Sequence, residues 1–196
     1  ARIGNFEYPE EISLRTYKPT VKGHPQQIKR VIHELQKSKR PIICVGGGVA
    51  LSQADKELIA FAEHHRIPVV STMMGIGIMP TKHPLYFGMV GNNGKPYANR
   101  AMNEADLIIM AGARVADRAI SQPDLIFDNK VLVHMDVDPA EIGKNVGPTL
   151  PLVGDAKHIF KDFEEQEFYC DSDAWVEQLN GYRSEMELKR KEHPGY

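Results

Sequence analysis

The sequence contains few cysteines and no long hydrophobic run, and these absences limit the classes of protein that it can encode. Its two cysteines, Cys44 and Cys170, show neither metal-ligand nor redox spacing. A disulfide framework is therefore disfavoured, and a reducing compartment such as the cytoplasm is expected. No apolar run approaches the roughly 20 residues that a membrane-spanning helix needs. The 24 basic and 26 acidic residues leave a net charge of −2, so we expect no binding to membranes or nucleic acid.

The sequence also lacks the short signatures of common catalytic sites. It contains no G-x-S-x-G nucleophile elbow and no P-loop. The eight histidines are scattered, and His64 and His65 are adjacent, so these two cannot form a metal-binding pair spaced i, i+4 on one helix face. The sequence therefore predicts neither a catalytic residue nor a metal ligand in this chain.

The most informative feature is a short apolar run that leads directly into three glycines. Residues 42–45 read Ile-Ile-Cys-Val, and Gly46, Gly47 and Gly48 follow. A strand that ends at glycines and continues into a helix leaves bare N–H groups at the helix N-terminus, which favours binding of a phosphate or pyrophosphate. The alternative is structural, because consecutive glycines also suit a tight turn with positive φ.

Alternating strand and helix patterns along the chain predict an α/β fold with a doubly wound parallel sheet. Further strands are predicted at 67–70, 107–111, 131–135 and 150–153, and helices at 26–38, 96–104, 156–165 and 171–193. A helix after the glycines is predicted to begin at Ser52, which forms a capping-box pattern with Asp55. Residues 71–95 are rich in glycine and proline, and we expect a long, irregular, functional loop there.

Polar residues and glycines follow the predicted strands at their carboxyl ends, where open α/β sheets bind ligands. Gly112 and Arg114 follow one strand, and Arg118 comes shortly after. A planar guanidinium suits phosphate, and a surface Arg–Asp pair is the alternative. Asp136 ends another strand, where its carboxylate is placed to reach a ribose or the edge of an adenine, or else to cap a helix or loop.

Six segments, taken in order, resemble the central domain of acetolactate synthase (acetohydroxyacid synthase), a thiamine diphosphate enzyme. They are P-I-I-C-V-G-G-G (41–48), S-T-M-M-G-I-G (71–77), F-G-M-V-G (87–91), A-D-L-I-I-M-A-G-A-R-V-A-D-R (105–118), H-M-D-V-D-P-A-E-I-G-K-N (134–145) and V-G-D-A (153–156). The resemblance covers about residues 25–165. It implies a DHS-like nucleotide-binding domain with a parallel sheet of about six strands flanked by helices. It also implies a linker from an upstream domain (1–24), a central FAD- or nucleotide-binding-type domain (25–168) and a C-terminal helical connector (169–196).

The resemblance implies an FAD site, since the central domain of the biosynthetic enzymes binds FAD that performs no redox step. Carried over residue by residue, the contacts fall on Gly46, Gly47, Gly48, Thr72, Met73, Met74, Gly88, Met89, Gly112, Ala113, Arg114 and Arg118, with Asp136, Val137, Gly154 and Asp155 at the adenine end. The family usually has G-M-H-G where this chain has Gly88-Met89-Val90-Gly91, so one imidazole is missing. It usually has R-F-D-D-R where residues 114–118 read R-V-A-D-R, so one carboxylate is missing. A related enzyme of the superfamily without FAD is the alternative.

For the whole enzyme, the resemblance implies condensation of two pyruvates, or of pyruvate and 2-oxobutyrate, with loss of CO₂ in branched-chain amino-acid biosynthesis. The G-D-G and N-N motif for thiamine diphosphate and Mg²⁺ is absent here, and the family's catalytic glutamate belongs to an upstream domain. The chain alone is therefore expected to be inactive and to bind neither group. Its implied partners are an upstream pyrimidine-binding domain, a downstream diphosphate-binding domain, further copies in a homo-oligomer, and a regulatory subunit in those enzymes that have one.

Two alternatives remain open at this point. One is a stand-alone nucleotide- or flavin-binding module, similar in fold to electron-transfer flavoprotein or sirtuin-like domains. The other is the central domain of another thiamine diphosphate-dependent decarboxylase or carboligase.

Overall fold

A six-stranded sheet in which every neighbouring pair is parallel forms the centre of the molecule. The computed structural model describes residues 20–114, 129–147 and 149–192. The strands are β1 (Pro41–Val45), β2 (Val69–Ser71), β3 (Tyr86–Met89), β4 (Leu107–Ala111), β5 (Val131–Asp136) and β6 (Leu150–Val153). Their order is β3-β2-β1-β4-β5-β6, so the direction of winding reverses between β1 and β4. The predicted doubly wound parallel sheet is confirmed, and its switch point lies between these two strands.

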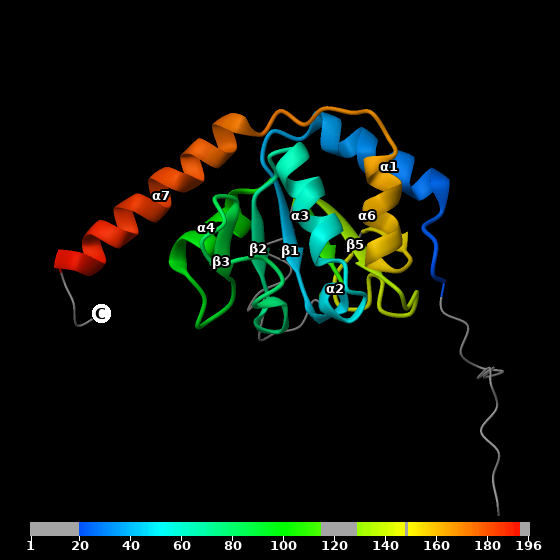
Figure 1. Ribbon diagram of the computed structural model, residues 1–196, viewed down its shortest axis with the longest axis horizontal. Coiled ribbons are helices and arrows are strands. Elements are labelled where there is room, and N and C mark those ends of the chain that lie inside the picture. Colours follow the sequence, from blue (N-terminus) through cyan, green and yellow to red (C-terminus); the bar gives the residue numbers. More distant parts are fainter. Residues whose placement is uncertain (1–19, 115–128, 148, 193–196) are drawn as a thin grey trace, which may run out of the picture.

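Helices cover both faces of the sheet (Figure 1). They are α1 (Pro25–Lys37), α2 (Gly47–Leu51), α3 (Asp55–His64), the 3₁₀ turn η1 (Met73–Gly75), α4 (Pro96–Glu104), α6 (Ala156–Glu164) and α7 (Asp173–Glu192). The buried side chains of α1, α3 and α6 pack in one core cluster, together with Val176 of α7, and those of α4 pack in the other, together with Trp175 and Leu179 of α7. Successive strand residues alternate between the clusters: Ile43 and Val45 face the first, and Ile42 and Cys44 face the second. Because both faces are covered, β1 is apolar throughout.

Two local predictions were wrong. Ser52 does not begin a helix; it ends α2, and its hydroxyl donates to the Val49 carbonyl at 3.1 Å. The next helix begins at Asp55, after Ala54, with no side-chain cap. The stretch 71–95 is also not irregular throughout, because it contains η1 and the edge strand β3. Tyr86 and Phe87 in β3 are buried, and the Tyr86 hydroxyl lies 2.7 Å from the Ser71 hydroxyl.

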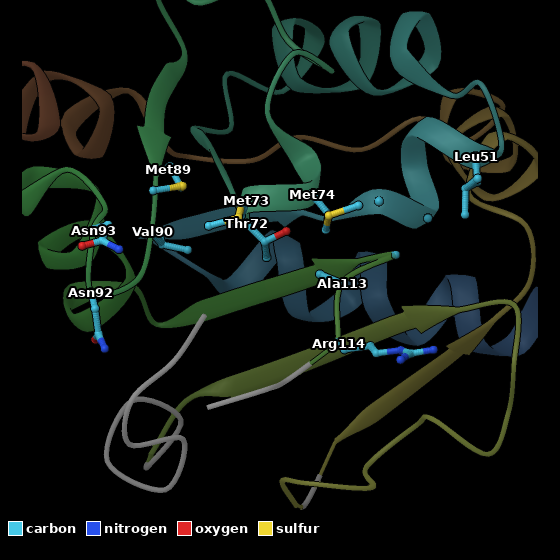
Figure 2. Close-up of a pocket in the computed structure, with 13 residues that line it drawn as sticks. Leu51, Thr72, Met73, Met74, Met89, Val90, Asn92, Asn93, Ala113 and Arg114 are labelled. Atoms are coloured by element: carbon cyan, nitrogen blue, oxygen red, sulfur yellow. The ribbon is translucent and has the colours of Figure 1, made fainter. Parts of the chain in front are cut away.

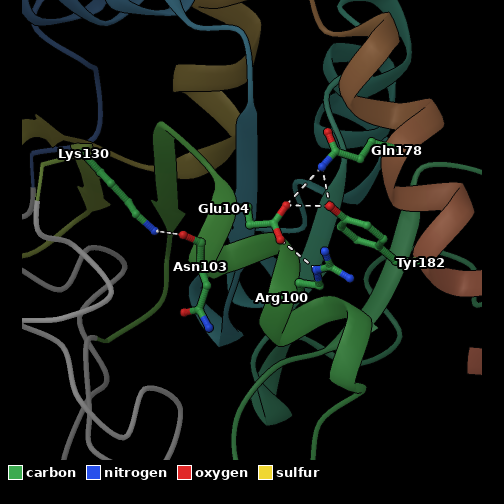
Figure 3. A network of polar contacts seen from close by, with 6 residues as sticks. All are labelled: Arg100, Asn103, Glu104, Lys130, Gln178 and Tyr182. Atoms are coloured by element: carbon green, nitrogen blue, oxygen red, sulfur yellow. Dashed lines mark hydrogen bonds and ion pairs between the residues drawn. The ribbon is translucent and has the colours of Figure 1, made fainter.

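The C-terminal helix α7 is docked against α4 and the edge strand β3. Figure 3 shows Glu104 accepting hydrogen bonds from Arg100 Nε (2.7 Å), the Tyr182 hydroxyl (2.7 Å) and Gln178 Nε2 (3.1 Å). Arg183 donates to the Tyr86 carbonyl at 2.8 Å and so occupies the open side of β3. The first half of α7 is therefore part of the domain's packing, which also covers a sheet edge that would otherwise be free to pair.

Candidate functional site

A pocket of about 650 Å³ opens at the carboxyl edge of the sheet, across the switch point. Its walls come from the segments that follow four neighbouring strands, β1 to β4. Figure 2 shows the lining residues: Gly47, Gly48, Leu51, Thr72, Met73, Met74, Met89, Val90, Asn92, Asn93, Gly112, Ala113 and Arg114. The volume lies in the range of small-molecule and cofactor sites, and the position is the one that the doubly wound topology favours for a ligand.

Glycines let the ends of β1 and β4 approach more closely than side chains would permit. A Cβ atom on Gly46 would lie 2.4 Å from the Gly112 carbonyl oxygen, and one on Gly48 would lie 2.7 Å from Gly112 Cα. Gly112 has φ +55°, whereas Gly46 has an ordinary extended φ of −122°. The alternative of a turn with positive φ at residues 46–48 is therefore wrong; the first and third glycines are required by close approach of the two backbones.

The same close approach occupies two of the three amides that the sequence assigned to phosphate binding. The Gly46 N–H donates to the Ala111 carbonyl and the Gly48 N–H to the Gly112 carbonyl, both at 2.9 Å. These two amides join β1 to β4, so the remaining amide at the pocket is that of Gly47, the first residue of α2. A ligand phosphate can therefore be held by one backbone group here, in place of the predicted three.

The wall beyond β2 is apolar and faces open space. Thr72 is buried, and its N–H donates to the Val45 carbonyl at 2.9 Å, which fixes the start of η1 against β1. Met73 and Met74 follow in η1 and are largely exposed, as is Leu51 on the neighbouring helix α2. A flat apolar ring could lie against such a wall, because methionine side chains adapt to irregular surfaces.

Arg114 brings a positive charge to the other side of the pocket. Its side chain is 78% exposed, and Nε lies 3.7 Å from Glu141 Oε2 in the loop after β5. The contact is long, and the Glu141 carboxylate has a closer partner in Lys144 Nζ at 2.9 Å, so the exposed guanidinium can exchange that carboxylate for a ligand anion. In the neighbouring strand β5, His134 is buried, and its Nδ1 accepts the Gly143 N–H at 3.4 Å. Burial lowers the pKa of His134, which keeps the imidazole neutral.

The chain matches, over residues 28–163, the family described as "Thiamine pyrophosphate enzyme, central domain". The chain belongs to this family. Acetolactate synthase large subunits are among its relatives. The one from Haemophilus influenzae is 37% identical over 190 residues, with 94% of this chain and 33% of that protein covered. A probable one from Methanocaldococcus jannaschii is 41% identical over 180 residues (90% and 30%), and one from Corynebacterium glutamicum is 36% identical over 196 residues (97% and 31%). The chain thus spans about a third of the length of these relatives.

In this thiamine pyrophosphate enzyme central domain, the pocket collects part of the residues assigned from the sequence. Those that line it are Gly47, Gly48, Thr72, Met73, Met74, Met89, Gly112, Ala113 and Arg114. Gly46 lies directly behind the lining, and Gly88 lies under the Lys95 side chain. Arg118 falls outside the described residues.

The residues assigned to an adenine end do not line the pocket. Asp136 accepts the Asp138 N–H at 3.0 Å and so stabilises the turn after β5, next to Val137. Asp155 accepts the Lys157 N–H at 3.0 Å as the N-cap of α6, and its own N–H donates to the Val21 carbonyl. Gly154 packs on the segment before α1. Asp136, which the resemblance assigned to the same ligand site as Gly47, Thr72 and Gly112, is therefore not among the residues that line the pocket, and its carboxylate accepts an N–H of its own turn.

Sequence reasoning missed four lining residues: Leu51, Val90, Asn92 and Asn93. Asn92 and Asn93 come shortly after β3, and residues that follow parallel strands meet at one edge; because the sequence did not predict β3, it gave no signal for them. The asparagines add amide groups at the end of the pocket farthest from Arg114 in Figure 2.

Within the described residues, no group of three or more histidine, cysteine, aspartate or glutamate side chains is placed to hold a metal ion. None of the helices in this part of the chain has both the length and the apolarity required to cross a bilayer. The two thiols, at Cys44 and Cys170, are free and buried, and burial raises the pKa of each to about 12. The thiols are therefore protonated and unreactive at neutral pH.

Proposed function

We propose that this chain is the central domain of an acetolactate synthase large subunit. The observation that carries the proposal is the similarity of 36 to 41% to proteins of that name over 90 to 97% of the chain. The whole protein would condense two pyruvates, or pyruvate and 2-oxobutyrate, with loss of CO₂. In that reaction this domain supplies no catalytic group; it supports the domains that hold thiamine diphosphate and Mg²⁺, within a homo-oligomer and alongside a regulatory subunit where one exists. Buried free thiols suit a cytoplasmic location.

We further propose that the pocket at the carboxyl edge holds FAD, and three features fit that group. Gly47 lines the pocket without a side chain, so a ligand can approach the backbone at this glycine. Met73, Met74 and Met89 provide an apolar wall for a flat ring. The Gly47 amide and the Arg114 guanidinium can hold an anionic group. FAD would act as a structural cofactor here, without a redox step.

The residues of the chain have separate tasks in this proposal. Arg114 neutralises and orients the phosphates, for which its bidentate geometry is suited. The methionines exclude water from one face of the ring. Asn93 presents an amide group to polar ring edges, which have hydrogen-bonding capacity that an apolar wall cannot satisfy. Val90 is buried at the pocket floor and contributes packing alone.

The experiment is to purify the whole natural protein and to supply pyruvate with thiamine diphosphate, Mg²⁺ and FAD. We expect acetolactate, measured as acetoin after acid treatment, and none from the 196-residue chain alone. A whole protein that consumes no pyruvate under these conditions would overturn the assignment. A pyruvate-derived product other than acetolactate would instead identify a different thiamine diphosphate-dependent decarboxylase or carboligase. Product formation by the isolated chain would contradict the scaffolding role.

The FAD site is tested separately by affinity. The isolated chain is expected to be colourless and to bind FAD weakly or not at all, whereas the whole protein retains the flavin. In the whole protein, Arg114→Ala should cost about 1.5–3 kcal/mol, roughly a 10- to 150-fold weaker affinity, because a charge-assisted contact is lost. Glu141→Gln is the matched control: it removes the ion-pair partner of Arg114 but keeps the guanidinium, so affinity should not fall. If Arg114→Ala and the parent protein bind FAD with equal affinity, Arg114 does not hold the phosphates of FAD.

A further inference from the structure

The methionines of the chain differ widely in exposure. Four of the eight are buried to 2% exposure or less: Met79, Met102, Met110 and Met135. Met89 is half-buried at the pocket. Met186 on α7 is 36% exposed and lies outside the pocket lining, whereas Met73 is 67% and Met74 is 74% exposed. The two most exposed thioethers are therefore adjacent in sequence and lie together on the wall of the pocket.

The backbone around this pair explains its exposure. Gly75 follows the pair, and a Cβ there would lie 2.3 Å from the Val45 carbonyl oxygen, so η1 is pressed against the end of β1. Thr72, on the other side of the pair, is bonded to the same carbonyl. With its flanking residues held against the strand, η1 presents the side chains of Met73 and Met74 outward. Figure 2 shows both side chains at the pocket. A Cβ atom on Gly47 would lie 3.3 Å from Met74 Cβ, so this methionine is next to the start of α2.

We propose that Met73 and Met74 form a site of reversible oxidation by hydroperoxides, through which oxidation controls the apolar character of the pocket. The sulfur lone pair attacks the terminal oxygen of the hydroperoxide, and an S–O bond forms as the O–O bond breaks. The sulfur is oxidised by two electrons, and the peroxide leaves as water or an alcohol after taking up a proton. Methionine sulfoxide is reduced back by thiol-dependent sulfoxide reductases, so the change can be reversed.

The consequence follows from the place of the pair. A sulfoxide is polar and requires hydrogen-bond partners, so it no longer offers an apolar surface to a flat ring. Oxidation should therefore weaken a ligand that lies on this wall and leave the fold intact, because the core methionines are inaccessible. The loss of FAD on oxidation rests on the proposed function, whereas the oxidation itself rests on the exposure of the two side chains.

The first test follows the order of oxidation. The chain is treated with a graded series of hydrogen peroxide concentrations, and sulfoxide at each methionine is measured by peptide mass spectrometry. We expect Met73 and Met74 to react on the order of tenfold faster than the four buried methionines, with Met186 in between. Oxidation of Met73 and Met74 at the rate of Met110 and Met135 would overturn the proposal.

The second test measures the loss of apolar surface with a probe that does not depend on FAD binding. The apolar dye 8-anilinonaphthalene-1-sulfonate should bind the untreated chain and lose severalfold in affinity after peroxide. A variant that combines Met73→Leu with Met74→Leu, which keeps the apolar volume without an oxidisable sulfur, should bind the dye equally before and after treatment. A loss of dye binding that is the same in this variant as in the parent would show that the effect arises elsewhere and would overturn the proposal.

The third test uses FAD in the whole protein. Peroxide should lower FAD affinity on the order of tenfold in the parent and leave the double leucine variant unchanged. If the untreated whole protein does not bind FAD, the proposed function of the pocket fails, and the oxidation site is then decided by the first two tests. If FAD binds but its affinity survives full oxidation of Met73 and Met74, the FAD site stands and control by oxidation is refuted.

Discussion

Replacement of Gly48 by alanine tests whether the close approach of β1 and β4 constrains the fold. A Cβ at this position would lie 2.7 Å from Gly112 Cα and 3.1 Å from the Gly112 carbonyl oxygen. Both are backbone atoms, so no side chain can rotate away. The turn after β4 and the start of α2 must separate, which also lengthens the hydrogen bond from the Gly48 N–H to the Gly112 carbonyl.

Gly47→Ala is a matched control in the same helix. Its Cβ would meet Met74 Cβ at 3.3 Å, a contact that a shift of the short turn η1 by a few tenths of an ångström relieves. Both variants gain the usual advantage of alanine over glycine in a helix, so that gain cancels in the comparison. The overpacking at Gly48 remains and should cost about 1–3 kcal/mol. For a chain of this size, the difference corresponds to a Tm lower by about 2 to 12 °C than that of Gly47→Ala.

The assay is thermal unfolding followed by circular dichroism, on both variants and the parent chain at the same concentration. Gly47→Ala should unfold at the parent's Tm or slightly above it. A Gly48→Ala chain that is as stable as Gly47→Ala would refute the reasoning, because the two backbones would then have room for a methyl group between them.

Three further predictions concern stability. Trp175→Ala should lower the free energy of unfolding by about 3–5 kcal/mol in urea titrations, since this buried ring anchors α7, and a cost below about 1 kcal/mol would contradict that role. Burial lowers the pKa of His65 to about 4 in the folded chain, below the unfolded value of 6.5. Between these two pH values the unfolded state binds more protons than the folded state. The free energy of unfolding therefore falls as the pH drops from 6.5 towards 4. The loss should reach about 2 kcal/mol at pH 5, and His65→Phe, which can keep the stacking on Phe168, should abolish that part of the pH dependence. Asp155→Ala should cost about 1 kcal/mol through loss of the α6 cap, whereas Asp136→Asn, which keeps an acceptor oxygen for the Asp138 N–H, should change stability little.

Most of the fold could be predicted from the sequence because its periodic signals are strong. The apolar runs that became β1, β4 and β5 are buried on both faces, and the helical stripes on α1 and α6 are wide. The strand β3 could not be found in the same way. It is four residues long, contains a glycine with φ +93°, and owes its place to pairing with β2 across residues 72–85, a contact that leaves no local signal.

The predicted site stays a prediction, although nine of the residues assigned to it line one pocket, and the roles of some residues were not predictable. A residue type after a strand indicates which groups gather at the edge; it does not indicate which of them are already bonded there. Asp136 and Asp155 carry carboxylates suited to a ligand, yet each accepts backbone N–H groups of the following turn or helix. That choice depends on local backbone geometry, to which short polar side chains are especially suited.

The glycines show the same difficulty most clearly. Residues 46–48 and 112–114 look like two separate ligand-binding motifs, because a long stretch of sequence divides them. In the fold they are one backbone unit: Gly46 and Gly48 donate hydrogen bonds to Ala111 and Gly112, and neither side has room for a Cβ. Since the unit uses most of its own polar groups, a ligand must be recognised by what protrudes from it. Those groups are the Gly47 amide, the Arg114 side chain and the two methionines of η1. Substitutions within the glycine unit should therefore act mainly on stability, and substitutions at the protruding groups mainly on affinity.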